Sequence, residues 1–260
     1  MSDGDWAKTL TTKPVPVHDG KILVGIDYLP HPIKKHLAYQ VAKRPAIQNV
    51  YHVTEILYCL RKAYWKRMGG GNDIDMAGLW NIYRGNTFDN AWSPLFEHNQ
   101  HTLKSERIHP ETDELLTITG TLDFIWVDEE NLEGVLYDLK MPKNIYYKKR
   151  DGAGKFYSGQ VQTYLAMAHE GGFYNNIHRC RVLMVADDIV IDEVPERPQM
   201  LDIMWDRTFL FHKALKDKNP NLLQGAEDDK WECNPLYCPG DVAWRLACKD
   251  FPIVDGYPTY

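Results

Sequence analysis

The spacing of apolar and polar positions changes along the chain and predicts a mixture of strands and helices. Residues 102–126 alternate and predict two strands joined by a turn at 109–113, and the apolar stretch 135–141 predicts another strand. Strands are also expected over 181–186 and 188–193. Helical spacing is found over residues 54–68, 76–97, 160–169 and 198–216. Strands with helices on both sides in the sequence predict an α/β fold.

Two segments carry little regular pattern. Residues 1–46 are rich in Pro, Lys and His and predict an extended arm, with one strand near 21–28. Residues 143–159 predict a polar, basic loop that contains several glycines. We therefore expect an N-terminal arm over 1–46 and one domain over 47–260, whose first helix has Thr54 as its N-cap.

The composition is that of a globular protein without a uniformly basic surface. The 260 residues are 44% hydrophobic and 25% charged, and the formal net charge is −6. No stretch approaches the ~18 apolar residues of a membrane span, and the apolar run 22–26 is too short for a signal peptide. We expect an intracellular (cytoplasmic) protein that makes no membrane contact. A nucleic-acid partner fits this charge where basic residues gather locally.

Two acids and a lysine interrupt apolar runs that otherwise predict buried strands. Asp123 lies within Leu-Asp-Phe-Ile-Trp, and Lys140 follows Asp138 by two positions. Because alternate residues of a strand face the same side, Asp138 and Lys140 point together, and a neighbouring strand would bring Asp123 beside them. Carboxylate oxygens are the ligands that Mg²⁺ and Mn²⁺ prefer. The Asp-x-Lys spacing is also typical of strands that end in solvent, so by itself it leaves both interpretations open.

A third motif lies on the helix that follows. Gln160 and Tyr164 are four residues apart and share a helix face. The order Gly-Thr-Leu-Asp (120–123), Asp-Leu-Lys (138–140) and Gln-x-x-x-Tyr (160–164) resembles the RecB-like branch of the PD-(D/E)xK nuclease superfamily. That branch carries an upstream Gly-x-x-x-His whose histidine binds metal. The matching stretch here is Gly-Asn-Thr-Phe-Asp (85–89), so Asp89 is either a metal ligand or a solvated helix residue.

The resemblance covers about residues 54–248 and implies a restriction-endonuclease-like core, with a mixed central sheet flanked by helices. The catalytic residues that it implies are Asp123, Asp138, Lys140, Gln160 and Tyr164, and the metal ligands are Asp89, Asp123 and Asp138. By this resemblance the acids hold Mg²⁺ or Mn²⁺, the lysine assists the attacking water, and the Gln–Tyr pair positions DNA or the lysine. His98 and Glu106 are weaker candidates for the metal shell.

Four of the five cysteines flank the expected nuclease core. Cys59 precedes it, and Cys233, Cys238 and Cys248 follow it. This layout resembles the iron–sulfur members of the RecB-like nucleases, among them the CRISPR-associated exonuclease family. It implies a [4Fe–4S] cluster that joins the N- and C-terminal segments. The C-terminal spacing Cys-x4-Cys-x9-Cys leaves zinc bound by four cysteines as an alternative. Cys180, on a predicted strand, is expected to be a core thiol.

Two basic segments are candidates for a DNA surface. The first contains Arg61, Lys62, Lys66 and Arg67. The second contains Lys143, Lys148, Lys149 and Arg150, interleaved with Tyr146 and Tyr147. Single-stranded DNA stacks its bases on such tyrosines while cations meet its phosphates. A solvated charged loop is the commoner role of such a run.

These patterns predict a metal-dependent deoxyribonuclease. The resemblance implies an exonuclease on single-stranded or frayed DNA ends. It would work in CRISPR adaptation, where integrase proteins are partners, in antiviral defence, or in viral or mobile-element DNA processing. Two alternatives stay open: a nuclease-fold protein that binds DNA or a partner without cutting, and a zinc protein whose acids are incidental. A homo-oligomer is compatible with these patterns.

The two metals expected for the cysteines differ in colour. We expect protein purified without oxygen to be brown, because an iron–sulfur cluster absorbs visible light whereas zinc is colourless. The measurement is an absorption spectrum together with iron and zinc analysis. Colourless protein that contains stoichiometric zinc would establish the alternative.

Overall fold

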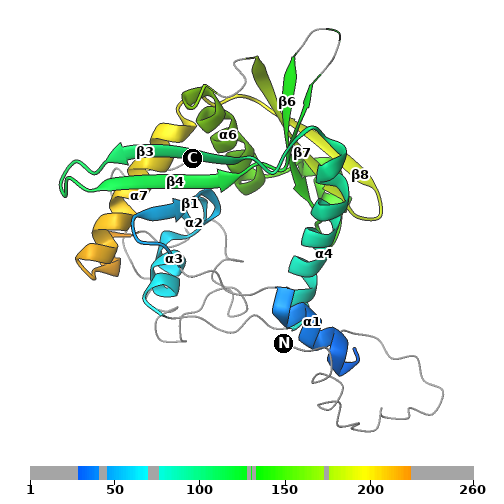
Figure 1. Ribbon diagram of the computed structural model, residues 1–260, viewed down its shortest axis with the longest axis horizontal. Helices are drawn as coiled ribbons and strands as arrows, with labels where there is room; N and C mark the ends of the chain where they lie inside the picture. Colours follow the sequence, from blue (N-terminus) through cyan, green and yellow to red (C-terminus); the bar gives the residue numbers. More distant parts are fainter. Residues whose placement is uncertain are drawn as a thin grey trace, which may run out of the picture.

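The computed structural model describes residues 29–40, 46–69, 76–127, 130, 133–172 and 176–223, and Figure 1 shows how its elements are arranged. The three C-terminal cysteines and the strand predicted near 21–28 lie outside these residues. In chain order the elements are α1 (His31–Gln40), β1 (Val50–His52), α2 (Val53–Leu57), α3 (Leu60–Arg67), α4 (Met76–Trp92), η3 (Ser93–Leu95), β2 (His98–Asn99), β3 (Thr102–Ile108), β4 (Leu115–Thr121), β5 (Phe124–Val127), β6 (Gly134–Lys140), α5 (Tyr146–Asp151), α6 (Lys155–Glu170), β7 (Ile177–Val185), β8 (Ile189–Val194), α7 (Met200–Lys216) and η4 (Pro220–Leu222).

Two mixed sheets form the centre of the protein. One has the strand order β1-β4-β3, with β1 parallel and β3 antiparallel to β4. The other has the order β2-β5-β6-β7-β8, in which β6 and β7 are parallel and the other pairs are antiparallel. Strand β4 passes into β5 through only two residues, Leu122 and Asp123. Asp123 therefore lies at the joint between the two sheets.

Helix α6 forms the main core with both sheets. It contacts β3, β6 and β7, and α7 packs on it. Val161 and Ala168 of α6 are fully buried. Trp205 of α7 is fully buried as well, and its indole N–H donates to the hydroxyl of Ser105 on β3 at 2.9 Å. This hydrogen bond allows the large ring to be buried without leaving its polar atom unpaired.

The other face of the five-stranded sheet is covered by α4 and the segment after it. Side chains from three strands point to this side, namely Phe124, Val135, Tyr137, Leu139 and Leu183. Phe88 and Trp92 of α4 pack on them. Phe96 stacks on Phe124 with ring centroids 3.8 Å apart. This packing fixes α4 against the sheet, so the residue that follows Phe88, Asp89, is carried to the same region.

The mixed α/β architecture is confirmed, but one predicted helix is wrong. The stretch 54–68 forms two helices, α2 and α3, separated by two residues. Buried Arg207 of α7 explains the break, because its guanidinium donates to the carbonyl oxygens of Ile56 at 2.9 Å and Tyr58 at 2.8 Å. Because these carbonyl oxygens accept from Arg207, they do not need the backbone N–H groups that a continuous helix would supply. The first helix begins after His52, so Thr54 is not its N-cap.

The N-terminal arm is also not extended throughout. Residues His31–Gln40 form helix α1, which contacts α4 (Figure 1). The ring of His36 meets that of Tyr83 edge to face, with centroids 5.6 Å apart, and Leu37 is 1% exposed. The arm is helical here because Leu37 buries its side chain, a tertiary contact that the local composition did not indicate.

The predicted loop 143–159 contains one complete helix and the start of another. Helix α5 occupies residues 146–151 and α6 begins at Lys155 rather than near Gln160. Gly152 and Gly154 have φ values of +70° and +78°, which let the chain turn sharply between the two helices. The N–H of Ala153 donates to Asp192 of β8 at 2.6 Å and fixes this turn to the sheet.

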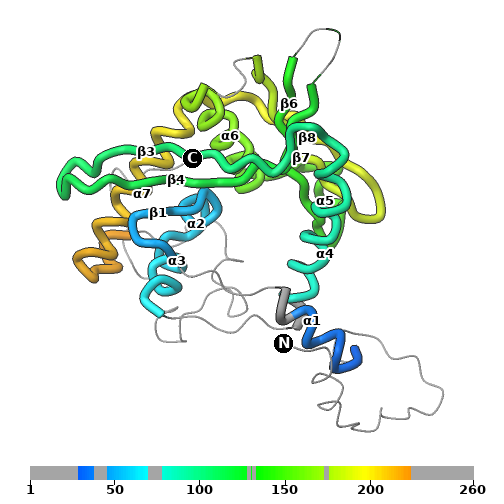
Figure 2. Tube along the Cα trace, in the orientation of Figure 1, coloured from blue at the N-terminus to red at the C-terminus, as the bar shows by residue number. Residues whose placement is uncertain are grey.

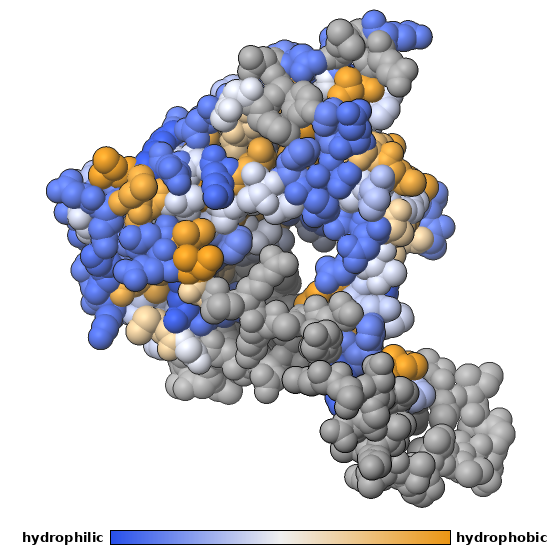
Figure 3. Space-filling model, viewed as in Figure 1, coloured by the Kyte–Doolittle hydropathy of each residue, from blue (hydrophilic) through white to orange (hydrophobic). Residues whose placement is uncertain are grey.

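The described surface offers no broad apolar area on the face drawn in Figure 3. That face is largely hydrophilic, and its hydrophobic side chains lie in small separate groups. Scattered exposed apolar residues of this kind are usual on globular proteins. No helix among the described residues is both long and apolar enough to cross a membrane.

A glycine is needed at position 120, near the end of β4, because other side chains lie close to its backbone. A Cβ there would overlap Cε1 of Tyr164 and lie 3.1 Å from Cγ2 of Val53. We expect Gly120→Ala to lower the free energy of unfolding by about 1–3 kcal/mol, because a packed ring must move. Gly85→Ala is the matched control. Nothing lies within 4 Å of a Cβ at that helical position, so alanine is expected to stabilise by about 0.5–1 kcal/mol. Urea denaturation measures both, and an equal destabilisation of the two variants would contradict the close approach.

Candidate active site

Strand pairing places Asp123 opposite Asp138. Phe124 pairs with Tyr137 in the antiparallel β5–β6 ladder, and the next pair in that register is Asp123 with Asp138. The N–H of Leu139 donates to Oδ2 of Asp123 at 2.5 Å. The two carboxylates that the sequence singled out are therefore brought together, on the end of β6 and at the joint between the sheets.

Asp138 is a buried carboxylate whose charge is met by the Lys140 ammonium. It is 1% exposed, and its Oδ1 accepts no hydrogen bond within the described part of the chain. Nζ of Lys140 lies 2.6 Å from Oδ2 of Asp138, so the ammonium pairs with this oxygen and compensates the charge. A buried carboxylate in this state is costly, and an added cation would offset that cost.

The acids and the lysine shift one another's pKa values. Burial and the Asp138 carboxylate raise the pKa of Asp123 to about 7, against the opposing effects of Lys140 and the Leu139 N–H. Burial also raises the pKa of Asp138. Burial by itself would lower the pKa of Lys140, but the two carboxylates outweigh it and raise that pKa above its usual value. Lys140 is thus an ammonium near neutral pH, beside acids that favour a proton or a metal ion.

Gln160 and Tyr164 support this group from α6. They lie on the buried face of the helix, where they are 6% and 3% exposed. The Gln160 amide donates to the Tyr164 hydroxyl at 3.0 Å. Burial and the charge of Asp138 raise the pKa of Tyr164, against the opposing effects of the Gln160 hydrogen bond and the Lys140 charge. Because the pair is buried, it can position the lysine, whereas it offers little surface to DNA.

Asp89 approaches the same acids from α4. Its carboxylate accepts from the hydroxyl of Ser93, and from the side-chain amide of Gln100 at 3.0 Å to Oδ1 and 2.9 Å to Oδ2. The negative charge of Asp89 contributes to the raised pKa values of Asp123 and Asp138. The structure therefore brings Asp89 toward the pair, with its oxygens already engaged by two hydrogen-bond donors.

The two weaker candidates for the metal shell have different positions. Glu106 is exposed on β3, where it accepts from Thr117 at 3.4 Å, four residues from the Thr102 end of that strand. It is not brought to the acids. His98 lies on β2 opposite Ile125, and its ring centre is 6.2 Å from that of His101.

Two carboxylates and open positions fit Mg²⁺ or Mn²⁺. Magnesium keeps several waters and is commonly held by one or two carboxylates together with substrate phosphates. Asp123 and Asp138 supply that pair, and a cation at Oδ1 of Asp138 would displace no hydrogen bond from a described residue. Within the described part of the chain, no three His, Cys, Asp or Glu side chains converge as a ready-made ligand set. Asp89 is therefore a neighbour of the two acids rather than a third member of a preformed set.

Sequence reasoning missed two residues that hold Asp89. Ser93 follows Asp89 by four residues, a helical spacing that could have revealed it. Gln100 reaches Asp89 after the chain has left α4 and passed through β2, so no local spacing indicates it.

The prediction that the first basic segment forms a DNA surface is wrong at two of its four positions. Arg61 is 2% exposed and donates to the carbonyl oxygen of Leu223. Arg67 forms two hydrogen bonds with Glu55, at 2.6 and 2.7 Å. Both guanidiniums hold parts of the fold together, so they are not available to phosphates.

The second basic segment begins beside Lys140. Lys148 of α5 donates to the carbonyl oxygen of Ala153 at 2.9 Å. Its Nζ lies 5.1 Å from the ring centre of Tyr157, and Nζ of Lys140 lies 5.6 Å from the same ring. Tyr157, a residue outside the predicted motifs, therefore links the lysine of the candidate site to the basic segment.

The rest of this segment is exposed. Tyr146 and Tyr147 are 69% and 58% exposed, and their rings meet edge to face. Lys149 pairs with Asp188 of the β7–β8 turn, and Arg150 pairs with Asp151. Such surface pairs are weak and exchange readily for other anions. Figure 2 shows α5 in its place next to β7 and β8.

The cysteines are only partly described. Cys59 is the half-buried N-cap residue of α3. The expected cluster partners Cys233, Cys238 and Cys248 lie outside the described residues, so the cluster stays a prediction. Cys180 is confirmed as a core thiol, because it is buried and donates to the Val194 carbonyl at 3.4 Å, and burial raises its pKa to about 12.

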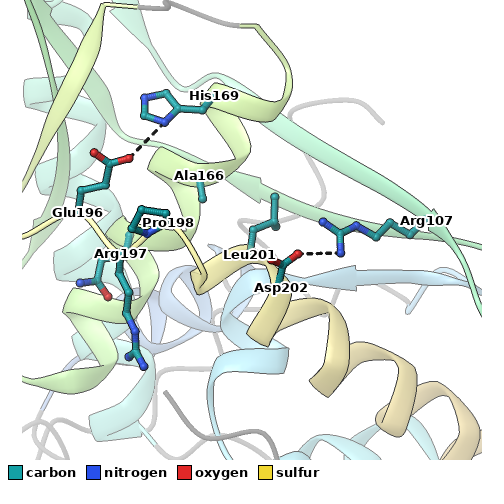
Figure 4. A pocket seen from close by; sticks show the side chains of 9 residues that line it. Arg107, Ala166, His169, Glu196, Arg197, Pro198, Leu201 and Asp202 are labelled. Carbon is teal, nitrogen blue, oxygen red and sulfur yellow. Dashed lines mark ion pairs between the residues drawn. The ribbon is translucent and has the colours of Figure 1, made fainter.

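A pocket of about 270 Å³ lies elsewhere, between α6 and the start of α7 (Figure 4). Its walls carry the ion pairs His169–Glu196, at 3.6 Å, and Arg107–Asp202, at 3.0 Å. None of its lining residues belongs to the acidic group around Asp138. Its walls carry mostly paired charges, so the acidic group remains the candidate active site.

Comparisons with known proteins find similar structures but no similar sequence. No protein-family model and no curated protein matches the chain. The crystal structure of SSO0001 has a TM-score of 0.54 and 13% identity, over 85% of this chain and 96% of that chain. An alkaline exonuclease (LHK-Exo) from Laribacter hongkongensis has a TM-score of 0.40 and 12% identity, over 65% of this chain and 89% of its own. The first likeness shows a shared fold, and the second is too distant to support a conclusion.

The raised pKa of Asp123 predicts a pH-dependent stability in metal-free protein. The folded state binds this proton more tightly than the unfolded chain, so stability falls as pH rises from about 4 through about 7. Asp123→Asn keeps an acceptor for the Leu139 N–H but has no charge. We expect it to be more stable than the wild type at pH 8, on the order of a few kcal/mol, with the difference shrinking toward pH 4. Chemical denaturation in EDTA measures this, and a difference independent of pH would contradict it.

Proposed function

We propose that this chain is a metal-dependent deoxyribonuclease that acts on single-stranded or frayed DNA ends. The observation that carries the proposal is buried Asp138, whose Oδ1 accepts no hydrogen bond from the described residues. Asp138 lies opposite Asp123, and its Oδ2 is 2.6 Å from the Lys140 ammonium. A carboxylate pair of this kind is suited to a divalent cation, and the adjoining ammonium is suited to a phosphate.

Asp123 and Asp138 would hold Mg²⁺ or Mn²⁺, which when bound lowers the pKa of a coordinated water and neutralises charge on a phosphate. Because the acids keep Lys140 protonated, the lysine would act as a cation rather than as a general base. In that role it orients the attacking water and stabilises the negative charge that develops on the phosphate oxygens. Gln160 and Tyr164 keep the lysine in place.

The DNA strand would follow the second basic segment. Exposed Tyr146 and Tyr147 offer faces on which bases can stack, and Lys149 and Arg150 lie beside them. Lys148 and Tyr157 would continue this path to Lys140. Single-stranded DNA suits the arrangement, because stacking on tyrosine needs bases that are free of a complementary strand.

Three finer points of the proposal rest on the motif resemblance. They are exonuclease action, a role in CRISPR adaptation or in viral or mobile-element DNA processing, and a [4Fe–4S] cluster on Cys59, Cys233, Cys238 and Cys248. The second candidate function is a nuclease-fold protein that binds DNA or a partner without cutting. It is favoured by one observation, namely that the oxygens of Asp89 are engaged by Ser93 and Gln100.

Degradation of end-labelled DNA tests the proposal. We expect single-stranded DNA to be cut with Mg²⁺ or Mn²⁺ and not with EDTA. Lys140→Met should lower the rate by about 10²–10³-fold, because it removes charge stabilisation at the phosphate. Lys104→Met, at an exposed position of β3, is the matched control and should cut normally. Folded wild-type protein that binds DNA but never cuts it would support the binding protein instead.

The basic path can be tested by binding alone. We expect the combined change of Lys148, Lys149 and Arg150 to Ala to weaken single-strand binding on the order of tenfold at low salt. The slope of log K against log salt concentration should become shallower by about 0.7 for each phosphate that the variant no longer neutralises. Lys213 and Lys216 of α7, which pair with Glu111 and Glu114, provide the matched double-alanine control. Equal affinities of the triple variant and the wild type at low salt would reject this path.

A further inference from the structure

Gln100 has an unusual backbone for its residue type. Its φ is +51°, in the left-handed region that Gly and Asn adopt most readily. The residue is exposed, so no burial requirement explains a glutamine at this position. Non-glycine residues in this region cost free energy and persist where other contacts hold them. The hydrogen bonds that Gln100 makes are therefore what holds it in this conformation.

Gln100 bonds the Asp89 carboxylate and the backbone of Asp123. Its backbone N–H donates to the main-chain carbonyl oxygen of Asp123 at 2.9 Å. Its side-chain amide donates to both oxygens of Asp89, at 3.0 and 2.9 Å. One residue thus connects the joint between the sheets, where Asp123 lies, with helix α4, which carries Asp89. An Asn or Gly would tolerate the backbone better but would not reach the Asp89 carboxylate.

The contact with two oxygens fixes how Asp89 is turned. A single donor leaves a carboxylate free to rotate about its last bond, whereas one amide shared by both oxygens restricts that rotation. The Ser93 hydroxyl adds a further donor at Oδ1. Asp89 is consequently held by α4 on one side and by the β2–β3 connection on the other.

We propose that Gln100 is a positioning residue that holds Asp89 toward the Asp123–Asp138 pair and thereby sets the affinity of the site for a divalent metal. The proposal rests on the proposed function, because it takes the acid pair to be a metal site. In it, Asp123 and Asp138 bind the ion, and Asp89 acts as a fixed negative neighbour whose orientation depends on Gln100.

The test is Mn²⁺ binding to the full chain, measured by calorimetry without DNA. Gln100→Gly removes the amide and suits the left-handed backbone, so the variant should melt no lower than the wild type. We expect its Mn²⁺ affinity to fall about tenfold or more, as is typical when a residue that orients a metal site is removed. Asp89→Asn should weaken binding as well. The double variant should bind no more weakly than Asp89→Asn, because Gln100 acts through Asp89.

Gln162→Gly is a control for the loss of a glutamine amide, since Gln162 of α6 donates to the carbonyl oxygen of Pro195 at 2.8 Å and not to a carboxylate. It should leave Mn²⁺ binding unchanged. Wild-type affinity in Gln100→Gly, or additive effects in the double variant, would overturn the positioning role while the metal site stands. Absence of Mn²⁺ binding to the wild type, or binding that Asp138→Asn does not weaken, would overturn the proposed function and this inference together.

Discussion

Two carboxylates that face each other across a strand pair, with one ammonium against them, are the constraint on which the rest of this structure depends. Asp123 and Asp138 repel each other, Asp138 is buried and Asp123 half-buried, and Lys140 neutralises only one negative charge. Left alone, such a group would lower stability, because burial favours neutral side chains. The fold holds it through the Leu139 N–H, the backbone path from β4 to β5, and the packed face of α6.

The same constraint connects stability, protonation and metal binding. With no cation, the pair retains protons more strongly than free aspartates do. A bound divalent ion would replace those protons and would stabilise the folded state by mass action. Functional sites commonly lower the stability of the unliganded protein, because their residues are selected for function rather than for stability. Gly120 shows the structural side of this demand, since a side chain at this position of β4 would overlap the ring of Tyr164.

The sequence was informative wherever local spacing decides the outcome. Alternation placed Asp138 and Lys140 on one side of β6, and helical spacing placed Gln160 and Tyr164 on one buried face of α6. The strand alternation and the helical runs also indicated the mixed α/β class. What the sequence did not reveal depends on contacts between distant residues. Arg207 ends α2 from 149 residues away along the chain by binding the Tyr58 carbonyl, and no local pattern records it.

The partners of Asp89 illustrate the same limit within the site. Ser93 lies at helical spacing and was accessible to local reasoning, whereas Gln100 depends on a left-handed turn and on the packing of α4. Likewise Arg61 belongs to a basic run in the sequence, yet it is buried and bound to the Leu223 carbonyl. A run of charged residues in the sequence does not show which of its side chains remain in solvent, because tertiary structure decides that.

The central claim is that the Asp123–Asp138 pair holds a divalent metal ion. Crystals grown with MnCl₂ and measured near the manganese absorption edge test it most directly, because the anomalous signal locates the ion independently of any activity. We expect an anomalous peak in contact with both carboxylates, which disappears in Asp138→Asn crystals grown in the same way. Well-ordered crystals with manganese elsewhere and none between the two carboxylates would contradict the claim.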